Sequence, residues 1–464
     1  DKNLQLSIRI LQNADGEFVS TDGYVYYQIE NTGHITADLT QDSREPITLW
    51  VQQDNLREQK ASLEERPEAI TSLQHGYITG GRIRLDLTGS PASVQMTLRL
   101  IANKTVLSDT SESIAVRLNT AAFSVESGHH YITDYAVSDP RMLFGRKLLK
   151  DNLLHQLSSG LAVVYGPSRI GKTSLLSVVD QCAEAKGNVL RILYGDESSG
   201  KFSDYRDRFC KGSDLAACYD DNQHVSEYLL VQSITAALES ETDRLNQIPS
   251  EELSQKLLSC LKSTNKSISA RYNEVNAILK NAEMELWLVL DEFQQVVESW
   301  KSISSSCEFA NICRFLGFYS RKHIGQTPQI KLLICGSDDL LRHMVIEDQS
   351  VWRQIFNDRC RIPVKPLEEE DFCHMMKEDD GISGSGIRYA PAALHTLFTY
   401  TGGVAIYGKE IGNVLLAKIQ NDPQHYQHRD TLYVSDIASA AQELLRSQTS
   451  QLDSGTTEGI REIY

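Results

Sequence analysis

The stretch Gly166-Pro167-Ser168-Arg169-Ile170-Gly171-Lys172-Thr173 fits the pattern G-x-x-x-x-G-K-[ST] and decides the fold of the middle of this chain. An apolar run typical of a buried strand, Leu161–Tyr165, precedes it, and an apolar pattern of helical spacing begins at Ser174. Two glycines let the backbone curl so that its N–H groups converge on a phosphate, and the following helix N-terminus adds its positive dipole end. We therefore expect a nucleotide-binding loop in which Lys172 reaches the β- and γ-phosphates and Thr173 ligates Mg²⁺.

A second apolar run, Leu286–Leu290, ends in the carboxylates Asp291 and Glu292. Five consecutive apolar residues are typical of a strand buried on both faces, and ligands bind at the carboxyl edge of such a sheet. We expect Asp291 to hold Mg²⁺, directly or through water. Glu292 would orient and deprotonate the attacking water, so the pair favours hydrolysis over mere binding.

Two further features concern the γ-phosphate. The strand-like run Ile330–Cys335 is followed by Gly336 and Ser337, and a polar side chain at that edge can hydrogen bond the γ-phosphate or the water. Several arginines precede the strand-like Ile362–Val364, and the order of elements favours Arg359 as the one that stabilises transition-state charge. A surface arginine is the alternative for Arg359.

The first ~120 residues alternate apolar and polar side chains, which indicates strands with one face in a core and one in water. Turn residues separate the runs, so we expect an Ig-like β-sandwich over residues 1–125. No cluster of acids, bases or nucleophiles lies in it, and a binding module without catalysis is the expected role. The strand-like runs are Leu4–Ile10, Tyr24–Ile29, Ile47–Val51, Ile83–Leu87, Val94–Leu100 and Ile114–Leu118.

Short apolar strands alternate with amphipathic helices over residues 126–366, which predicts an α/β core with a parallel sheet. The core includes a strand at Val189–Tyr194 and helices around Val225–Leu238 and Glu251–Leu279. Helices dominate residues 367–447, where Pro391 opens one helix and Ser435 is expected to cap another at Ile437–Leu445. A polar tail, 448–464, completes the predicted division into a sandwich, an α/β core with the P-loop and a helical segment.

Composition favours a globular protein over a nucleic-acid-binding, membrane-spanning or zinc-binding one. The 464 residues are 41% apolar and 23% charged, as in globular chains, and carry a net charge of −16 that disfavours broad phosphate binding. All apolar runs are much shorter than the ~18 residues of a membrane span. The nine cysteines are scattered without a C-x-x-C pair, which favours reduced thiols in a cytoplasmic protein over zinc ligands. No leader pattern opens the sequence, whose first residue is Asp.

Five ordered motifs resemble those of STAND-type P-loop ATPases, which are related to AAA+ and archaeal-type ATPases. The motifs are Met142–Arg146, Tyr165–Leu176, Leu290–Phe293, Cys335–Ser337 and Thr401–Gly403, so the resemblance covers about residues 140–445. It implies that Phe144 and Arg146 lie at the base or ribose and that the segment from residue 367 is a lid over the nucleotide. Tight ADP retention does not follow, because Val404-Ala405 lacks the proline usual in the family's lid.

These features together predict an ATPase switch that binds ATP or ADP with Mg²⁺ through Gly166–Ser174. Its nucleotide state would control self-association into a homo-oligomer or an attached effector, while the sandwich contacts a protein partner. By resemblance, bacterial relatives act in stress or antiphage signalling. Two alternatives stay open: an AAA+ ATPase acting on DNA, such as a loader or transposition protein, and a scaffold that holds nucleotide without hydrolysis.

Overall fold

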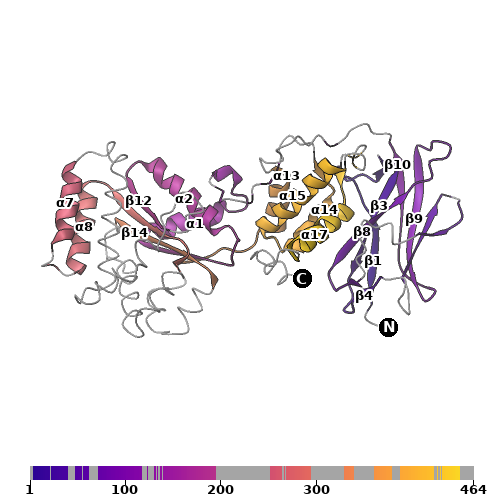
Figure 1. Ribbon diagram of the computed structural model, residues 1–464, viewed down its shortest axis with the longest axis horizontal. Coiled ribbons are helices and arrows are strands. Elements are labelled where there is room, and N and C mark those ends of the chain that lie inside the picture. Colours follow the sequence, from indigo (N-terminus) through magenta and orange to yellow (C-terminus); the bar gives the residue numbers. More distant parts are fainter. Residues whose placement is uncertain are drawn as a thin grey trace. The chain divides into compact units, whose positions relative to one another are not determined.

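The computed structural model divides the chain into two compact units, and many of their elements are labelled in Figure 1. A discontinuous unit combines residues 1–133 and 366–464, and an inserted unit holds residues 134–365. No helix in the described part of the chain is long and apolar enough to cross a bilayer. The structure describes residues 4–20, 22–39, 47–54, 56–61, 72–117, 123, 130–131, 133, 136–137, 139–194, 251–263, 266, 268–293, 329–338, 360–378, 387–422, 426, 429 and 431–449.

The inserted unit is built on a five-stranded sheet in the order β12-β13-β14-β11-β15. Every pairing in it is parallel, which confirms the predicted parallel sheet. The inner strands are buried along their length, because an all-parallel sheet is covered on both faces. Its strands are β11 (Leu161–Tyr165), β12 (Val189–Tyr194), β13 (Glu285–Leu290), β14 (Ile330–Gly336) and β15 (Arg361–Pro363).

Helices are interspersed with strands along the inserted unit, and α1 precedes β11. The helical stretch expected over Glu251–Leu279 is divided into two helices, because α7 ends at Lys262 and α8 begins at Ile268 after a polar stretch. The helix expected around Val225–Leu238 lies outside the described residues. The described helices are η2 (Pro140–Met142), α1 (Lys147–Ser158), α2 (Lys172–Lys186), α7 (Glu251–Lys262) and α8 (Ile268–Asn281).

The described strands between residues 4 and 117 form two sheets, β1-β3-β8 and β2-β10-β9-β5-β6, that share one hydrophobic core. Both sheets contribute fully buried side chains to that core, including Ile29, Leu49 and Leu98. Strands β4 and β7 form a separate two-stranded sheet. The strands are β1 (Leu6–Ile10), β2 (Val19–Ser20), β3 (Tyr24–Asn31), β4 (Ala37–Asp38), β5 (Thr48–Gln53), β6 (Gln59–Ala61), β7 (Ser72–Leu73), β8 (Ile78–Arg84), β9 (Ser93–Ala102) and β10 (Thr105–Val116).

Residues 366–449 form the helical part of the discontinuous unit. Pro391 opens α14, as predicted from its sequence position. The last described helix begins at Val434 rather than at Ile437, so Ser435 lies in its first turn. The carboxylate of Asp436 accepts a hydrogen bond from the N–H of Tyr433 at 2.7 Å. The elements are α13 (Glu369–Glu378), β16 (Arg388–Tyr389), α14 (Pro391–Thr401), α15 (Ala405–Asn421), β17 (Thr431–Leu432) and α17 (Val434–Thr449).

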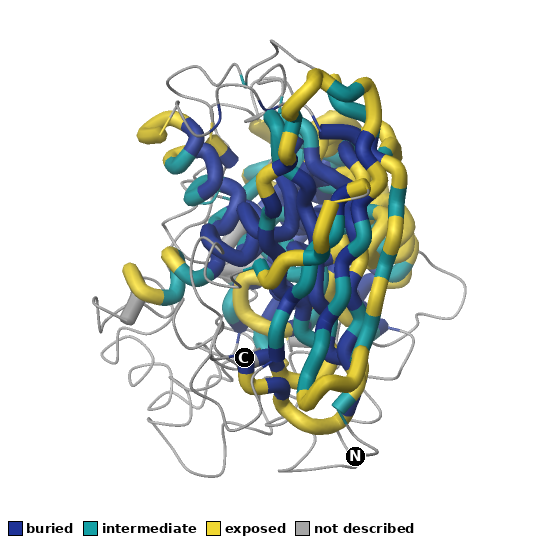
Figure 2. The backbone as a smooth tube through the Cα atoms, turned by 90° about the vertical axis from the view of Figure 1, so that its right-hand side faces the viewer, coloured by how far each residue is buried: buried dark blue, intermediate teal, exposed yellow. Residues whose placement is uncertain are grey.

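Strand β3 is buried on both faces, although one face in water is expected from a strand of this region. Val25 and Ile29 point into the core between the sheets, whereas Tyr26 stacks on Tyr433 with ring centroids 3.8 Å apart. Helix α17 therefore covers the outer face of the β1-β3-β8 sheet, as Figure 1 shows, and buried segments of the chain are dark blue in Figure 2. The C-terminal helices and the N-terminal sheets consequently share one packed body.

Candidate nucleotide-binding site

Three loops meet at the carboxyl edge of the parallel sheet. The register pairs Tyr165 with Gly336 and Leu290 with Ile334, so β11, β13 and β14 end at the same level. The segment after β11 is Gly166–Thr173, the residues after β13 are Asp291 and Glu292, and Ser337 follows β14. Because ligands bind at this edge of open parallel sheets, the three loops form the candidate site.

The loop Gly166–Gly171 has the backbone that its sequence requires. Gly171 has φ 98° immediately before α2, and Arg169 has φ 60°, an uncommon conformation for a residue with a Cβ atom. A Cβ built on Gly166 would lie 2.6 Å from the carbonyl oxygen of Val364, so only glycine fits there. Pro167, Ser168 and Arg169 are exposed, and Ile170 is buried beneath them. The loop is therefore a tight turn whose outer face is open to a ligand.

Lys172 lies in the first turn of α2 and is 5% exposed. Its Nζ donates to the carbonyl oxygens of Pro167 at 2.8 Å and Gly166 at 3.1 Å. An ammonium group that binds two neutral carbonyls of its own loop can exchange them for the charged oxygens of a phosphate at little conformational cost. No side chain in the described part of the chain caps the N-terminus of α2, which leaves its first N–H groups for an anion.

Thr173 and Asp291, far apart in the sequence, are in direct contact. The Thr173 hydroxyl donates to Oδ2 of Asp291 at 2.7 Å, and the N–H of Glu292 donates to Oδ1 of the same carboxylate at 3.0 Å. Asp291 is 2% exposed. Glu292 has φ 50°, a strained backbone conformation that is common at functional sites. The end of β13 thus holds the buried Asp291 carboxylate in place, and the backbone turns sharply at Glu292.

Cys335 is a residue of this site that sequence reasoning did not single out for a role. It is fully buried at the end of β14, where its thiol hydrogen bonds to the Asp291 carboxylate. Burial, and then the negative charge of Asp291, raise the pKa of this thiol well above its usual range. Cys335 is therefore a neutral donor to Asp291 at physiological pH. Its place after an apolar run and before Gly336 was the available signal.

The remaining predicted residues surround the loop. Arg146 donates from Nη2 to the carbonyl oxygen of Ile170 at 3.4 Å, which brings the segment before α1 against the loop. The Ser174 hydroxyl accepts a hydrogen bond from the N–H of Val137 at 3.0 Å. Phe144, just before Arg146, and Ser337, just after β14, are half-buried. Arg359 lies outside the described residues.

These donors and acceptors fit a nucleotide with Mg²⁺. A hydroxyl and a carboxylate oxygen 2.7 Å apart are the hard oxygen ligands that Mg²⁺ takes, usually few from the protein and the rest from water and phosphate. An uncapped helix N-terminus and a lysine beside it complete the phosphate side. The inserted unit therefore has a P-loop nucleotide-binding fold, with the loop between β11 and α2.

No family model matches this chain, and no curated protein matches it either. Among solved structures, it is similar to a Walker-type ATPase of Pyrococcus abyssi, with 16% identity and a TM-score of 0.42 over 68% of this chain and 77% of that one. The Aeropyrum pernix ORC2 protein has 14% identity and a TM-score of 0.34 over 66% and 68% of the two chains. A RuvB mutant of Thermotoga maritima has 10% identity and a TM-score of 0.34 over 66% and 72%. Similarities this distant assign no role to any residue, so each role proposed below depends on the geometry of the site.

Proposed function

We propose that this chain is an ATP-binding and ATP-hydrolysing molecular switch of the STAND or AAA+ type. The observation that carries the proposal is the contact between the Thr173 hydroxyl and the Asp291 carboxylate, with Lys172 folded onto the same loop. A loop that only closes a strand–helix turn has no need for a buried carboxylate from another strand at this point. The pairing of loop and carboxylate is what a Mg²⁺-nucleotide requires.

Each residue has a proposed task. Thr173 and Asp291 would hold Mg²⁺, which neutralises phosphate charge when bound. Lys172 and the first N–H groups of α2 bind the β- and γ-phosphates. Glu292 orients the attacking water and accepts its proton, because its carboxylate follows the metal ligand directly at the sheet edge.

Four further residues have proposed tasks on the base and γ-phosphate sides. Phe144 and Arg146 contact the base or ribose from the segment before α1. Ser337 hydrogen bonds the γ-phosphate or the water from the neighbouring strand, and Arg359 stabilises transition-state charge. The contact of Arg146 with the Ile170 carbonyl supports its place beside the loop.

The switch would act through the parts outside the inserted unit. We propose that residues 1–125 are an Ig-like β-sandwich that binds a protein partner, residues 126–366 the ATPase core and residues 367–447 the helical lid. Loss of the γ-phosphate would change the balance between two arrangements of core and lid, and this balance would control self-association or an attached effector. The cytoplasm is the proposed compartment, since ATP is available there.

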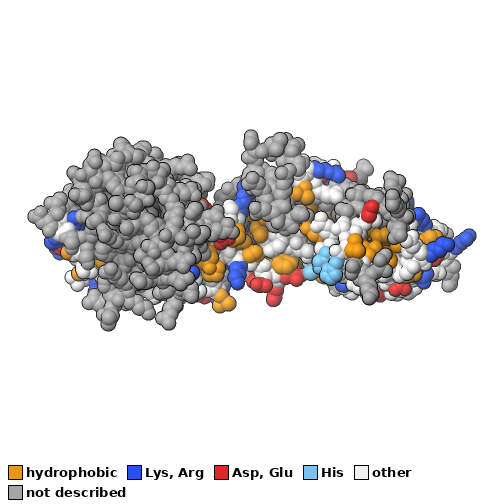
Figure 3. All heavy atoms as spheres, turned by 90° about the horizontal axis from the view of Figure 1, so that it is seen from below, with side chains coloured by type: hydrophobic (Ala, Val, Ile, Leu, Met, Phe, Trp, Pro, Cys, Tyr) orange, Lys and Arg blue, Asp and Glu red, His pale blue; other side chains and the backbone are white. Residues whose placement is uncertain are grey.

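An ATPase that acts on DNA is the second candidate, because it would use the same P-loop. A nucleic-acid groove needs a basic footprint, whereas the chain carries a net charge of −16. On the face drawn in Figure 3, the described side chains mix acidic, basic and apolar groups with a patch of histidines. These observations favour the switch. ATPase activity that rises with added DNA and falls with salt would favour the DNA candidate instead.

The test measures ATP affinity, ATP turnover and native mass with ADP, ATP and a non-hydrolysable analogue. Lys172→Ala should lose ATP affinity, and Glu292→Gln should keep ATP bound while turnover falls by about 10²-fold or more. Lys256→Ala and Glu252→Gln, an exposed ion pair on α7, are matched controls and should behave as wild type. ATP affinity unchanged in Lys172→Ala would refute nucleotide binding, and normal turnover in Glu292→Gln would remove Glu292 from catalysis.

A further inference from the structure

The chain passes between its two units twice, once after residue 133 and once after residue 365. Each passage is a short connector whose ends are held by hydrogen bonds. On the side of the inserted unit, both connectors are held at the P-loop. On the side of the discontinuous unit, both are held by the C-terminal helices.

The first connector begins at Tyr131, which is fully buried among the helices. Its N–H donates to the Asn413 side chain at 2.7 Å, and the Asn413 amide donates back to its carbonyl oxygen at 2.9 Å. A Cβ built on Gly412 would lie 2.3 Å from the Tyr131 ring, so α15 carries glycine where this ring packs. Six residues later, the N–H of Val137 donates to the Ser174 hydroxyl at 3.0 Å. Ser174 directly follows Thr173, so this connector is held at the end of the P-loop.

The second connector is shorter. The N–H of Val364 donates to the carbonyl oxygen of Tyr165 at 2.8 Å, at the start of the P-loop. The carbonyl oxygen of Val364 lies against Gly166, because a Cβ atom built on Gly166 would lie only 2.6 Å from it. Three residues later the N–H of Leu367 donates to the carbonyl oxygen of Gly403 at 2.9 Å, in the turn that ends α14. Only Lys365 and Pro366 lie between the two anchored residues.

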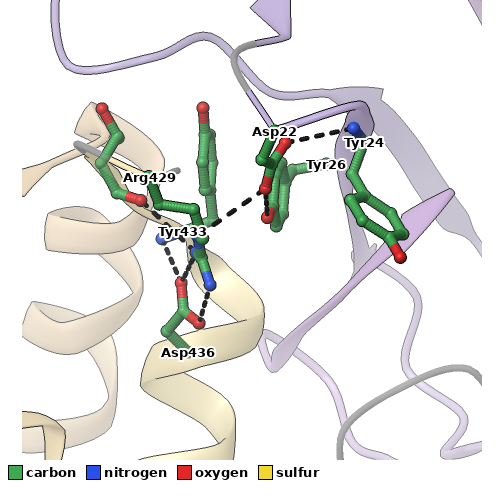
Figure 4. Close-up of polar contacts among 7 residues, drawn as sticks. Asp22, Tyr24, Tyr26, Arg429, Tyr433 and Asp436 are labelled. Atoms are coloured by element: carbon green, nitrogen blue, oxygen red, sulfur yellow. Dashed lines mark hydrogen bonds and ion pairs between the residues drawn. The ribbon is translucent and has the colours of Figure 1, made fainter. Parts of the chain in front are cut away.

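The discontinuous unit that receives both connectors is locked together by a buried cluster, drawn in Figure 4. Arg429 is 2% exposed and donates from Nη1 to Oδ1 of Asp436 at 3.1 Å and from Nη2 to Oδ2. Its Nε lies 3.9 Å from the carboxylate of Asp22, which comes from the N-terminal sheets and accepts a hydrogen bond from the Tyr26 hydroxyl. The guanidinium also lies over the Tyr26 ring, 5.1 Å from its centroid.

Further contacts join the helices to the same sheet. The Tyr400 hydroxyl of α14 donates to the carbonyl oxygen of Ile78 in β8. A Cβ built on Gly80 of β8 would lie 2.9 Å from the backbone of Ser435 in α17, so helix and strand are in close contact. A buried charge cluster and close packing of this kind resist sliding, because partial separation would leave charges and hydroxyls unsatisfied. The sheets must therefore follow the helices.

We propose that the nucleotide state of the P-loop is transmitted through the two anchored connectors to the whole discontinuous unit, with Ser174 as a positioning residue. This inference rests on the proposed function. The part that moves is then the helices together with the N-terminal sheets, so a partner bound by the sheets would respond to ATP directly. The Ser174 hydroxyl joins the helix turn that binds phosphate to the backbone of the first connector, and the loss of one hydrogen bond shifts a two-state balance by about fivefold.

The experiment uses the full chain with fluorophores on encoded unnatural amino acids, because nine native cysteines preclude thiol labelling. One pair joins Arg9 to Glu443 within the discontinuous unit, and another joins Glu443 to Asp151 of the inserted unit; all three side chains are more than half exposed. Energy transfer is recorded with saturating ADP and with a saturating non-hydrolysable ATP analogue, at low labelled fraction so that only intramolecular transfer counts.

The expected result is a nucleotide-dependent change for the pair between units and none for the pair within the discontinuous unit. Ser174→Ala should reduce the change between units to less than about half, Ser174→Thr should retain it, and Ser177→Ala, one turn along α2, should leave it at the wild-type value. Three results would each overturn the inference. The first is a nucleotide-dependent change in energy transfer within the discontinuous unit. The others are a change between units in Ser174→Ala equal to that of wild type, and no change between units in protein that binds ATP. Failure to bind ATP at all would instead refute the proposed function and the inference with it.

Discussion

Asp436→Asn is expected to loosen the contact between the C-terminal helices and the N-terminal sheets. The substitution keeps the size of the side chain but removes the charge that faces the buried guanidinium of Arg429. Breaking a buried ion pair from one side typically costs about 3–5 kcal/mol, because the other charge stays buried. The Asp22 carboxylate, 3.9 Å from Arg429, remains as a second counter-charge, so we expect the lower end, about 3 kcal/mol.

Amide hydrogen exchange is the suitable assay, since it reports the opening of each segment separately in a chain of two units. A loss of about 3 kcal/mol corresponds to roughly 100-fold faster exchange at the amides of α17 and β3. Amides of β11 and α2, which lie in the inserted unit, should keep their wild-type rates. Asp139→Asn is the matched control, because its carboxylate pairs with Arg141 at an exposed site where ion pairs contribute little. An increase below about tenfold in Asp436→Asn, or an equal one in the control, would refute a locked unit.

Three further predictions concern other packed positions. Gly412→Ala places a methyl group 2.3 Å from the Tyr131 ring and should lower the stability of the discontinuous unit by about 1–3 kcal/mol in denaturant unfolding. Burial alone would raise the pKa of Glu285, but hydrogen bonds from its lysine partner on β14 and from the neighbouring indole outweigh burial and hold the pKa below its ordinary 4.5. Glu285→Gln should therefore be less stable than wild type at pH 7, and this difference should shrink as the pH falls below 4.5 through the lower pKa of the folded state. Cys335→Val removes a donor to Asp291 and should raise the Mg²⁺ concentration for half-maximal ATP turnover by about tenfold, whereas Cys335→Ser, which retains a donor, should not.

The part of the site that the sequence predicts is the part fixed by short, local patterns. The strand Val189–Tyr194, the P-loop between β11 and α2, and the carboxylates after β13 all depend on apolar runs and on glycine conformations that are visible in the letters. The positive φ of Glu292 has no such signal, since a carboxylate residue is forced into it by the surrounding structure. The same holds for Cys335, whose contact with Asp291 depends on the register of β13 and β14.

The longest strand that the structure describes, β10, illustrates a different limit. The sequence predicts a strand only at Ile114–Leu118, whereas β10 covers Thr105–Val116. No residue before Ile114 is buried, and only Val106 and Leu107 among these nine residues are apolar, so alternation of apolar residues cannot reveal the strand. Backbone pairing with β9 forms it instead, through a two-residue turn in which Asn103 and Lys104 both have positive φ. That turn is the type that joins tightly twisted hairpins, and asparagine at its first position was the available signal.

The two-sided burial of β3 bears on how the N-terminal sheets can be studied. A fragment that ends at residue 125, where composition changes, would lack α17 and so expose the outer face of β3 and β8. Tyr26 would lose its stacked partner Tyr433, and Asp22 would lose the guanidinium that approaches it. Because the Tyr26 ring, 3% exposed in the intact unit, would meet water together with the part of β8 that contacts α17, the fragment is expected to associate through this sheet surface. The helices that cover this sheet follow the entire inserted unit in the sequence. Any fragment designed to bind a partner should therefore contain both the sheets and the C-terminal helices.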